Sequence, residues 1–291
     1  MRIGTVIQAR MLSTRFPGKS LKPLGETTVM GFMMERLRNG LKHLGPIILA
    51  TSEDKSCDPL ELEARRIGGI EVIRGDEHNV LSRFITAVDK FKLDMVVRIT
   101  GDNTFHDPKI IEGMVEHALR YKLDLCDNFR GPMPFPLGLN LDVISADALC
   151  RTWAATDKVE EDEQHVVIYA RKNTRRGFTF GYYNSPYKIP MEMRLTVDSP
   201  EDYEVIKNIY GHFKDPMKEI TMESLLELWA THPHYFAPNK DVQQKFLSSR
   251  ASTFDAIAPW EARMPEPQVV IDRAKVGSAE GRKARETVKK G

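Results

Sequence analysis

The first nineteen residues combine an apolar run with a cluster of cations and hydroxyl groups. Residues 3–7 lead into a segment whose cationic and hydroxyl side chains are Arg10, Ser13, Thr14, Arg15 and Lys19. Guanidinium groups bind phosphate oxygens bidentately, and an ammonium acts as a mobile point charge. The set therefore suits a polyanion such as a nucleoside triphosphate. A basic loop in solvent is the alternative, but Pro17-Gly18 fixes a turn close after the apolar run and favours the first interpretation.

Two carboxylates follow strand-like segments that lie far apart in the chain. Asp102 comes after residues 95–99 and beside Gly101, and Asp198 comes after residues 191–197, 96 positions later. Ligands of open α/β sheets bind beyond the carboxyl ends of strands, so the two can converge on one hard cation bound to phosphate. The structural alternatives are a turn aspartate at 102 and support of the helix cap at Ser199.

Four strand-to-helix units in succession must position these residues. We expect strands at residues 3–7, 47–50, 70–73 and 95–99, each followed by a helix with its own start signals. Such repetition predicts an α/β fold with a doubly wound, mainly parallel, Rossmann-like sheet. The helix after the second strand is expected to open with a capping box at Asp58 and Glu61.

Further elements are expected in the second half of the chain. Strands are predicted over residues 139–144, 178–182 and 191–197. Helices are predicted from Ser145, from Glu160 through Tyr169, over 200–213 and over 221–230. His232-Pro233-His234 is expected to form a turn, because no third metal ligand is visible. Phe246, Phe254 and Trp260 predict that part of the extension after residue 231 docks on another surface.

Composition narrows the possible functions. The 291 residues are 41% apolar, enough for a substantial core, and 42 basic against 41 acidic residues give a formal charge of +1. We therefore expect no general nucleic-acid binding. Three cysteines in odd number indicate a reducing compartment. With no signal sequence and no apolar run near the ~20 residues of a membrane span, the expected location is cytoplasmic.

The residues from Gln8 to Lys19, with Thr100-Gly101-Asp102, resemble the nucleotide-binding signature and metal-binding tripeptide of the cytidylyltransferases that activate acidic sugars. That family includes CMP-ketodeoxyoctulosonate and CMP-nonulosonate synthetases and the spore-coat-polysaccharide type. The resemblance implies a nucleotide-diphospho-sugar transferase-like domain over residues 1–231, followed by an extension over 232–291 whose end we expect to be mobile. The chain departs from the family at Leu12 and at residues 103–106.

The resemblance also implies an activity. A Mg²⁺-dependent enzyme would transfer CMP from CTP to an acidic sugar, release pyrophosphate and serve surface polysaccharide or glycan synthesis. Its catalytic residues would be Arg10, Lys19, Asp102 and Asp198, the two aspartates holding the metal. The implied nucleotide contacts are Gln8, Ala9, Arg10, Ser13, Thr14, Arg15, Lys19, Thr51, Arg74 and Asp76. For Asp76 and Glu77, helix capping is an equal alternative.

In the resembling family, the segment matching residues 127–190 carries acceptor and dimer contacts, so a homodimer is expected. The implied acceptor contacts are Asn140, Asp142, His165 and Arg194, with Asn140 standing where the family usually has an acid. A structural helix histidine and an Arg194–Glu192 pair are the alternatives. Two other functions remain open: a glycosyltransferase that uses a nucleotide sugar, and a non-catalytic nucleotide-binding relative.

Overall fold

The structure, a computed structural model, describes residues 1–242 except Leu12 and Thr14, and its centre is a seven-stranded sheet of order β5-β4-β1-β6-β8-β7-β9. Within this sheet only β8 runs antiparallel to its neighbours. The strands are β1 Ile3–Gln8, β4 Ile47–Ser52, β5 Ile70–Gly75, β6 Met95–Thr100, β7 Leu125–Asp127, β8 Asp142–Ser145 and β9 Phe180–Tyr182. A two-stranded hairpin, β2 Pro23–Leu24 with β3 Thr27–Thr28, lies outside it. The predicted doubly wound, mainly parallel α/β fold is confirmed.

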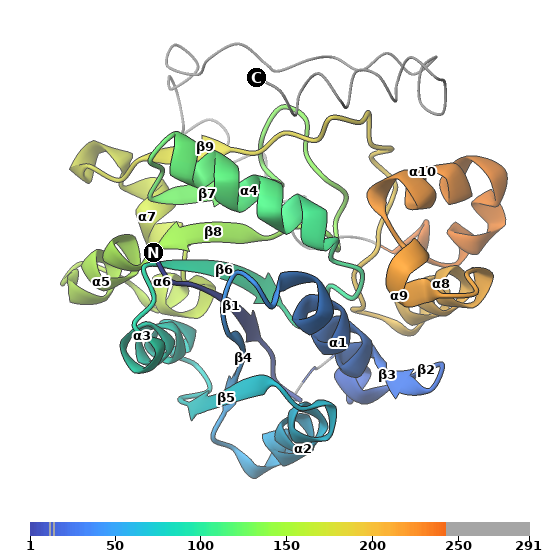
Figure 1. Ribbon diagram of the computed structural model, residues 1–291, viewed down its shortest axis with the longest axis horizontal. Helices are drawn as coiled ribbons and strands as arrows, with labels where there is room; N and C mark the ends of the chain where they lie inside the picture. The colour runs from blue at the N-terminus through green and yellow to red at the C-terminus, as the bar shows by residue number, and fades with distance from the viewer. Residues whose placement is uncertain (12, 14, 243–291) are drawn as a thin grey trace.

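Helices cover both faces of the sheet, and a further group lies at one side (Figure 1). The helices are α1 Val29–Leu41, α2 Asp58–Ile67, α3 Val80–Phe91, α4 Pro108–Arg120, α5 Ala146–Ala154, α6 Glu160–His165, α7 Ile168–Lys172, α8 Pro200–His212, α9 Pro216–Glu219 and α10 Met222–Thr231. Apolar residues of α1, α2 and α4 pack on one sheet face, and those of α3, α5 and α7 on the other. The helices α8 to α10 form the lateral group in Figure 1.

Each helix layer packs on the sheet through apolar residues that recur at helical spacing. In α1, Met30, Met33, Met34 and Leu37 recur at helical spacing and are fully buried against the sheet. The lateral group buries a third cluster, in which Leu225 and Leu228 of α10 meet Phe236. Because this cluster also contains residues of the 193–197 segment, the lateral helices fix the position of the chain just before Asp198.

Residues 191–197 do not form a strand of the sheet, contrary to prediction. Met193, Leu195 and Val197 are buried in the third cluster, so their alternation reflects one-sided burial rather than ladder pairing. The segment makes only two isolated bridges within the described residues, Asn103 with Thr196 and Leu137 with Arg194. Asp198 therefore lies beyond an extended segment, not beyond a sheet strand.

The predicted strand over 139–144 pairs with the sheet only from Asp142 onward. The side-chain amide of Asn128 takes the place of a neighbouring strand before that point, since it donates to the Leu139 carbonyl and accepts from the Leu141 N–H, both at 2.9 Å. The short strand β7, which pairs with β8, was not predicted from the sequence.

Two predicted helix features are wrong. The single helix through His165 and Tyr169 is broken at the buried Val166, whose φ of 60° is outside the helical range. The predicted capping box at Asp58 does not form: Cys57 is the N-cap of α2, and the carboxylates of Asp58 and Glu61 bind Arg74 at 2.5 and 3.0 Å.

The described part of the C-terminal extension continues the lateral group. Residues 233–235 form a short 3-10 helix, so the predicted turn after His232 is confirmed. Asn239 is buried and donates to the Arg194 carbonyl at 3.1 Å and to Asp202 at 2.9 Å. Phe246, Phe254 and Trp260 lie outside the described residues, as does the predicted mobile end.

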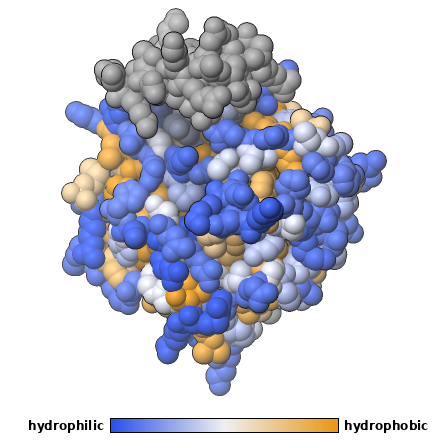
Figure 2. All heavy atoms as spheres, turned by 45° about the vertical axis from the view of Figure 1, so that its right-hand side comes forward, coloured by the Kyte–Doolittle hydropathy of each residue, from blue (hydrophilic) through white to orange (hydrophobic). Residues whose placement is uncertain are grey.

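On the face shown in Figure 2, apolar residues occur as small patches among hydrophilic ones. None of the helices between residues 1 and 242 combines the length and hydrophobicity that a membrane crossing requires.

A buried histidine makes the folded state sensitive to acid. His106 is 1% exposed, neither ring nitrogen has a hydrogen-bond partner, and its carbonyl accepts from the buried Arg36 at 2.7 Å. Burial, and to a lesser extent Arg36, lower the pKa of the His106 ring from 6.5 to about 3. The unfolded chain therefore binds the proton more readily than the folded chain, and stability falls as pH drops below 6.5.

We expect His106→Leu to reduce this sensitivity. Between pH 7.5 and 5.0 the wild type should lose about 2 kcal/mol more free energy of unfolding than the variant, from the protonation of one unfolded-state imidazole. Urea titrations at both pH values measure the difference. The exposed His234→Leu is the control and should behave as the wild type. Equal losses in the wild type and His106→Leu would show that His106 is not the acid-sensitive group.

Candidate active site

A tight turn sets the direction of Lys19. The Lys19 N–H donates to the Phe16 carbonyl at 3.3 Å, and Gly18, third in this four-residue turn, has φ 70° and ψ 10°. That conformation is the one a type II turn requires at its third position, where glycine is favoured and proline is common one residue earlier. The predicted Pro17-Gly18 turn is thus present.

The ammonium of Lys19 lies between two carboxylates that are far apart in sequence. Its Nζ is 2.8 Å from Asp198 Oδ1 and 3.5 Å from Asp102 Oδ2, and Arg15 contacts Asp198 Oδ1 at 3.0 Å. Burial alone would raise the pKa of the Asp198 carboxyl, but Lys19 and Arg15 more than offset it and hold the pKa below its usual value. Two of the three cations named from the sequence, Arg15 and Lys19, and both aspartates therefore meet in one cluster.

Backbone contacts hold the two aspartates together. The Val197 N–H donates to the Asp102 carbonyl at 2.8 Å, next to the bridge between Asn103 and Thr196. On the other side, the Gly101 N–H donates to the Gln8 carbonyl at 2.9 Å, and a Cβ at Gly101 would lie 2.7 Å from the Ala9 Cβ. Glycine is needed here because the loop after β6 passes so close to the end of β1.

Asp202 forms a buried hub behind Asp198. Arg194 binds it with two nitrogens, Nε at 2.7 Å and NH2 at 2.9 Å, and also reaches Asp198 Oδ2 at 3.5 Å. The same carboxylate accepts from the backbone N–H groups of Asp198 and Ser199, at 2.9 and 3.1 Å. Arg194 therefore pairs with Asp202 rather than with Glu192, and it supports Asp198 from behind.

The remaining residues named for the nucleotide lie along the carboxyl ends of β1, β4 and β5 but do not form one cluster. Arg10 is exposed and pairs with Glu77 at 3.2 Å, while Arg74 points to α2. Asp76 accepts from the N–H groups of His78 and Asn79 and so stabilises the turn before α3, whose N-cap is Asn79. Three other residues were named for the nucleotide. The Thr51 hydroxyl is buried without a hydrogen-bond partner, and the Ser13 hydroxyl accepts from the Phe16 N–H at 3.3 Å. Thr14 lies outside the described residues.

A second cluster lies on the same sheet, on the neighbouring strands β6, β8 and β7. Arg98, Asp142 and Asp127 stand at one register across β6, β8 and β7, on the face whose preceding positions bury Val96, Ile144 and Leu125. The face thus changes from apolar to charged within two residues. Arg98 NH1 contacts Asp142 Oδ2 at 2.6 Å, and its Nε donates to Gln8 Oε1 at 2.9 Å.

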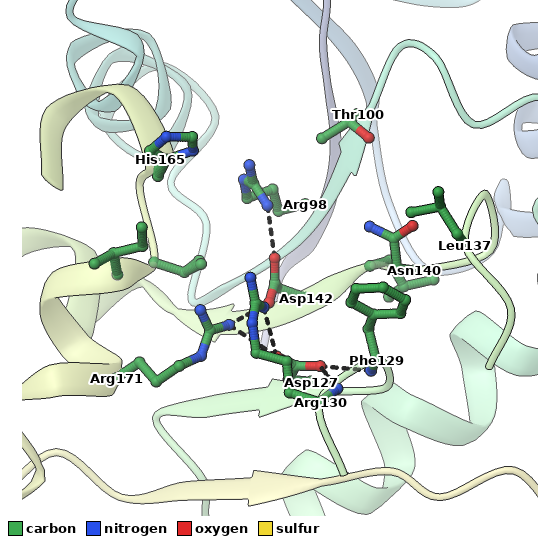
Figure 3. Close-up of a pocket in the computed structure, with 13 residues that line it drawn as sticks. Arg98, Thr100, Asp127, Phe129, Arg130, Leu137, Asn140, Asp142, His165 and Arg171 are labelled. Atoms are coloured by element: carbon green, nitrogen blue, oxygen red, sulfur yellow. Dashed lines mark hydrogen bonds and ion pairs between the residues drawn. The ribbon is translucent and has the colours of Figure 1, made fainter. Parts of the chain in front are cut away.

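Two further guanidinium groups complete this charged cluster. Arg171 of α7 contacts Asp127 at 2.8 Å and Asp142 at 3.1 Å, and Arg130 contacts Asp127 at 2.9 Å. Figure 3 shows the three arginines around the two carboxylates, with His165 and Asn140 at the edge of the same space. They line a cavity of about 160 Å³.

Asn140 connects this cavity to the Asp102 loop. Its side-chain oxygen accepts from the Gly138 N–H at 3.0 Å and from Asn103 Nδ2 at 3.3 Å, and Asn103 also donates to Thr100 at 2.9 Å. Gly138 has φ 101°, and a Cβ there would lie 2.2 Å from the Leu195 carbonyl carbon, so no other residue fits.

His165 ends α6 at the edge of the cavity, where the unusual backbone of Val166 redirects the chain into α7. Desolvation, and then the Arg98 cation, lower the pKa of the His165 ring. Of the residues named for the acceptor, Asn140, Asp142 and His165 share this cavity, whereas Arg194 lies in the Asp198 cluster.

Four charged cavity residues were not identified from the sequence: Arg98, Asp127, Arg130 and Arg171. A charged residue within the apolar run 95–99 was a usable signal for Arg98, because a buried arginine needs a partner. The Asp127–Arg171 contact joins positions 44 apart and had no such signal.

Among residues 1–242 with their two gaps, no three His, Cys, Asp or Glu side chains are gathered as a metal site. Asp102 and Asp198 nevertheless fit a Mg²⁺ that is shared with a bound triphosphate, since this ion commonly takes one or two carboxylates and fills its other positions with phosphate and water. Their sharing of the Lys19 ammonium shows that both carboxylates reach one cation.

The mainly parallel α/β sheet carries a cationic loop after β1 and two carboxylates, Asp102 in the loop after β6 and Asp198 after an extended segment. This arrangement agrees with a nucleotidyltransferase fold. Residues 5–227 match the model of the family described as Cytidylyltransferase. This match spans well over half of the chain. The protein therefore belongs to the cytidylyltransferase family.

Two relatives are similar to the chain over different lengths. The chain is 32% identical to the spore coat polysaccharide biosynthesis protein SpsF of Bacillus subtilis over 210 residues, which cover 70% of this chain and 85% of the relative. It is also 32% identical to the 8-amino-3,8-dideoxy-manno-octulosonate cytidylyltransferase of Shewanella amazonensis over 125 residues, 42% of this chain and 49% of that protein.

Solved structures match over most of the described chain. A cytidylyltransferase from Leptospira borgpetersenii is 29% identical and superposes with a TM-score of 0.76, covering 84% of this chain and 100% of the other. A CMP:2-keto-3-deoxy-manno-octonic acid synthetase complexed with CTP gives a TM-score of 0.56 at 15% identity, over 73% of this chain and 99% of the other. The second match shows the common fold.

Asp202 should be the main stabilising group of the site. We expect Asp202→Ala to lower the free energy of unfolding by about 3–5 kcal/mol, because it leaves the buried Arg194 without its partner. Chemical denaturation measures the loss. Asp215→Ala, which removes a surface pair with Lys218, is the matched control and should cost less than about 1 kcal/mol. A loss below about 1 kcal/mol for Asp202→Ala would refute its role as the hub.

Proposed function

We propose that this protein transfers CMP from CTP to a hydroxyl group of an acidic sugar, releases pyrophosphate and requires Mg²⁺. Family membership and the relatives named for octulosonate activation and for spore coat polysaccharide synthesis support the proposal. The product would enter surface polysaccharide or glycan synthesis, and two copies of the chain would pair through residues 127–190.

One observation carries the proposal: Lys19 bridges Asp102 and Asp198. An ammonium held only by carboxylates can move to phosphate when a triphosphate binds beside it, because its flexible stem allows several directions. That exchange, together with a move of Arg15 from Asp198 to phosphate, would leave Asp102 and the Oδ1 atom of Asp198 free for a divalent ion. The same side chains thus supply charge for the phosphates and ligands for the metal.

The reaction requires that the acceptor oxygen be positioned in line with the α-phosphorus and that the charge of the leaving pyrophosphate be neutralised. The acceptor oxygen forms a bond to the α-phosphorus while the bond from that phosphorus to the bridging oxygen breaks, and pyrophosphate leaves in line. Arg15, Lys19 and the exposed Arg10 would neutralise the β- and γ-phosphates. Asp102 and Asp198 would hold Mg²⁺, which would supply charge neutralisation for the phosphates and acidification of the attacking hydroxyl. The scheme requires no histidine base.

The acceptor would lie in the cavity lined by Asn140, Asp142 and His165. Thr100 lines the same cavity and is two residues from Asp102, so a hydroxyl held there is close to the metal ligands. Arg194 would act by positioning Asp198, since its guanidinium already binds Asp202.

Asp198→Asn should fold and lose most CTP-dependent pyrophosphate release. The amide keeps the shape of the side chain but removes the charge that the metal needs, and we expect at least a hundredfold fall in turnover. A coupled pyrophosphate assay with an acidic sugar panel measures it, with Asp215→Asn as the surface control. Turnover near the wild-type rate in Asp198→Asn would exclude the metal role.

Lys19→Ala should lower kcat/KM at least tenfold, because a preorganised charge that faces the leaving group typically contributes several kcal/mol to transition-state stabilisation. Lys22→Ala, three residues later, is the matched control: its ammonium lies 5.2 Å from the Phe16 ring centre rather than in the carboxylate cluster. If both variants lose activity equally, Lys19 has no special role.

The same assay separates the competing functions. A glycosyltransferase would release no pyrophosphate from CTP and would consume a nucleotide sugar. A non-catalytic relative would bind CTP and release no pyrophosphate with any acidic sugar. Pyrophosphate release that needs both CTP and an acceptor is expected only of the cytidylyltransferase.

A further inference from the structure

The extension after residue 231 contributes one side chain to the support of the Asp198 cluster, that of Asn239. It is 3% exposed, and its Nδ2 donates to Asp202 Oδ1 at 2.9 Å and to the Arg194 carbonyl at 3.1 Å. Both partners are acceptors, so the amide must present its NH2 group to them, and a hydroxyl, with a single donor, could satisfy only one. Asn239 also lies beyond residues 5–227, the segment that matches the family model.

The two partners of Asn239 lie on either side of Asp198 in the sequence. Arg194 precedes Asp198 by four positions, and Asp202 follows it by four. One NH2 group therefore joins the two ends of the segment that carries Asp198 at its middle. Asp202 also accepts from the Asp198 N–H at 2.9 Å, so a shift of the Asp202 carboxylate moves the Asp198 backbone with it.

The position of Asn239 is fixed by the packing of the extension on α8. Phe236 is buried in the third apolar cluster, and Asn208 of α8 donates to the Tyr235 carbonyl at 3.3 Å. The 3-10 turn that ends at Asn239 packs against α8 as well, and Asp202 lies in the first turn of that helix. Donor and acceptor are thus held by the same helix, which keeps their separation constant.

We propose that Asn239 is a positioning residue for the metal site: by joining Asp202 to the Arg194 carbonyl, it holds the Asp198 carboxylate where a divalent ion can use it. The inference rests on the proposed function, in which Asp198 binds Mg²⁺. Groups behind a metal ligand orient it, and their loss typically costs about 10–100-fold in metal affinity or activity. An amide that only satisfied buried acceptors would add to stability and leave metal binding unchanged.

The gain in CTP affinity that Mg²⁺ provides tests this role without turnover. Calorimetry on the full chain measures the dissociation constant of CTP with excess Mg²⁺ and with EDTA, and the ratio of the two constants is the gain. Asn239→Ala should reduce the gain about tenfold, because Asp198 is no longer held in place. Asn208→Ala, which removes another amide–carbonyl contact of the lateral group, is the matched control and should keep the wild-type gain.

A second substitution keeps the shape of the side chain and reverses its hydrogen bonding. In Asn239→Asp a carboxylate faces the Asp202 carboxylate and the Arg194 carbonyl, and repulsion between these groups should abolish the gain. A wild-type gain in a folded Asn239→Ala protein overturns the proposal, even where Asn239→Asp does not fold. Equal losses of the gain in Asn239→Ala and Asn208→Ala also overturn it, because the effect then follows from loosening of the lateral helices.

Failure of this inference and failure of the proposed function give different results. Mg²⁺ that strengthens CTP binding equally in the wild type and in Asn239→Ala leaves the cytidylyltransferase function standing and rejects the positioning role. A gain that depends on Asn239, without pyrophosphate release from any acidic sugar, rejects the proposed transfer and keeps the positioning role. The absence of any gain in the wild type rejects the metal role of Asp198 and this inference with it.

Discussion

A single ammonium group, that of Lys19, holds the two halves of the site together. Two carboxylates this close would repel each other in the ligand-free protein, and the shared cation removes that cost. The surrounding structure positions the three side chains that make this contact. The turn at Gly18 directs Lys19, the close approach at Gly101 places Asp102, and Asp202 fixes the segment that carries Asp198. In the proposed function, binding of a nucleotide would be an exchange of ion pairs rather than the filling of an empty site.

The second constraint is the change of character along one face of the sheet. Val96 is core, and Arg98, two residues later on the same face, is part of a charged cluster. A buried row of charged residues typically makes the folded protein no more stable than apolar residues of similar volume at the same positions would. Its presence is explained by ligand binding better than by folding, because the same positions filled with aliphatic residues would extend the core at no electrostatic cost.

Much of the fold could be predicted because its signals are local. Apolar runs, caps and turn residues identify the first four strand-to-helix units and the Lys19 loop. The errors arise where distant residues decide the outcome. Burial against the lateral helices made residues 191–197 resemble a strand, and the Asn128 amide replaced ladder pairing before Asp142. The cavity was only partly foreseen, since Asp127 and Arg171 meet through the sheet order and the helix break at Val166.

The two clusters are not independent, because hydrogen bonds connect them through adjacent strands. Arg98 binds both Asp142 and Gln8, and Gln8 is aligned with Thr100 at the ends of β1 and β6. Asn140 gives a second connection, through Asn103, to the loop that carries Asp102. With the acceptor and the nucleotide bound as proposed, the spacing between them would be set mainly by the sheet register, which is rigid, and less by loop conformation. A transfer that relies on positioning two substrates in line benefits from that rigidity, since small misplacements reduce its rate steeply.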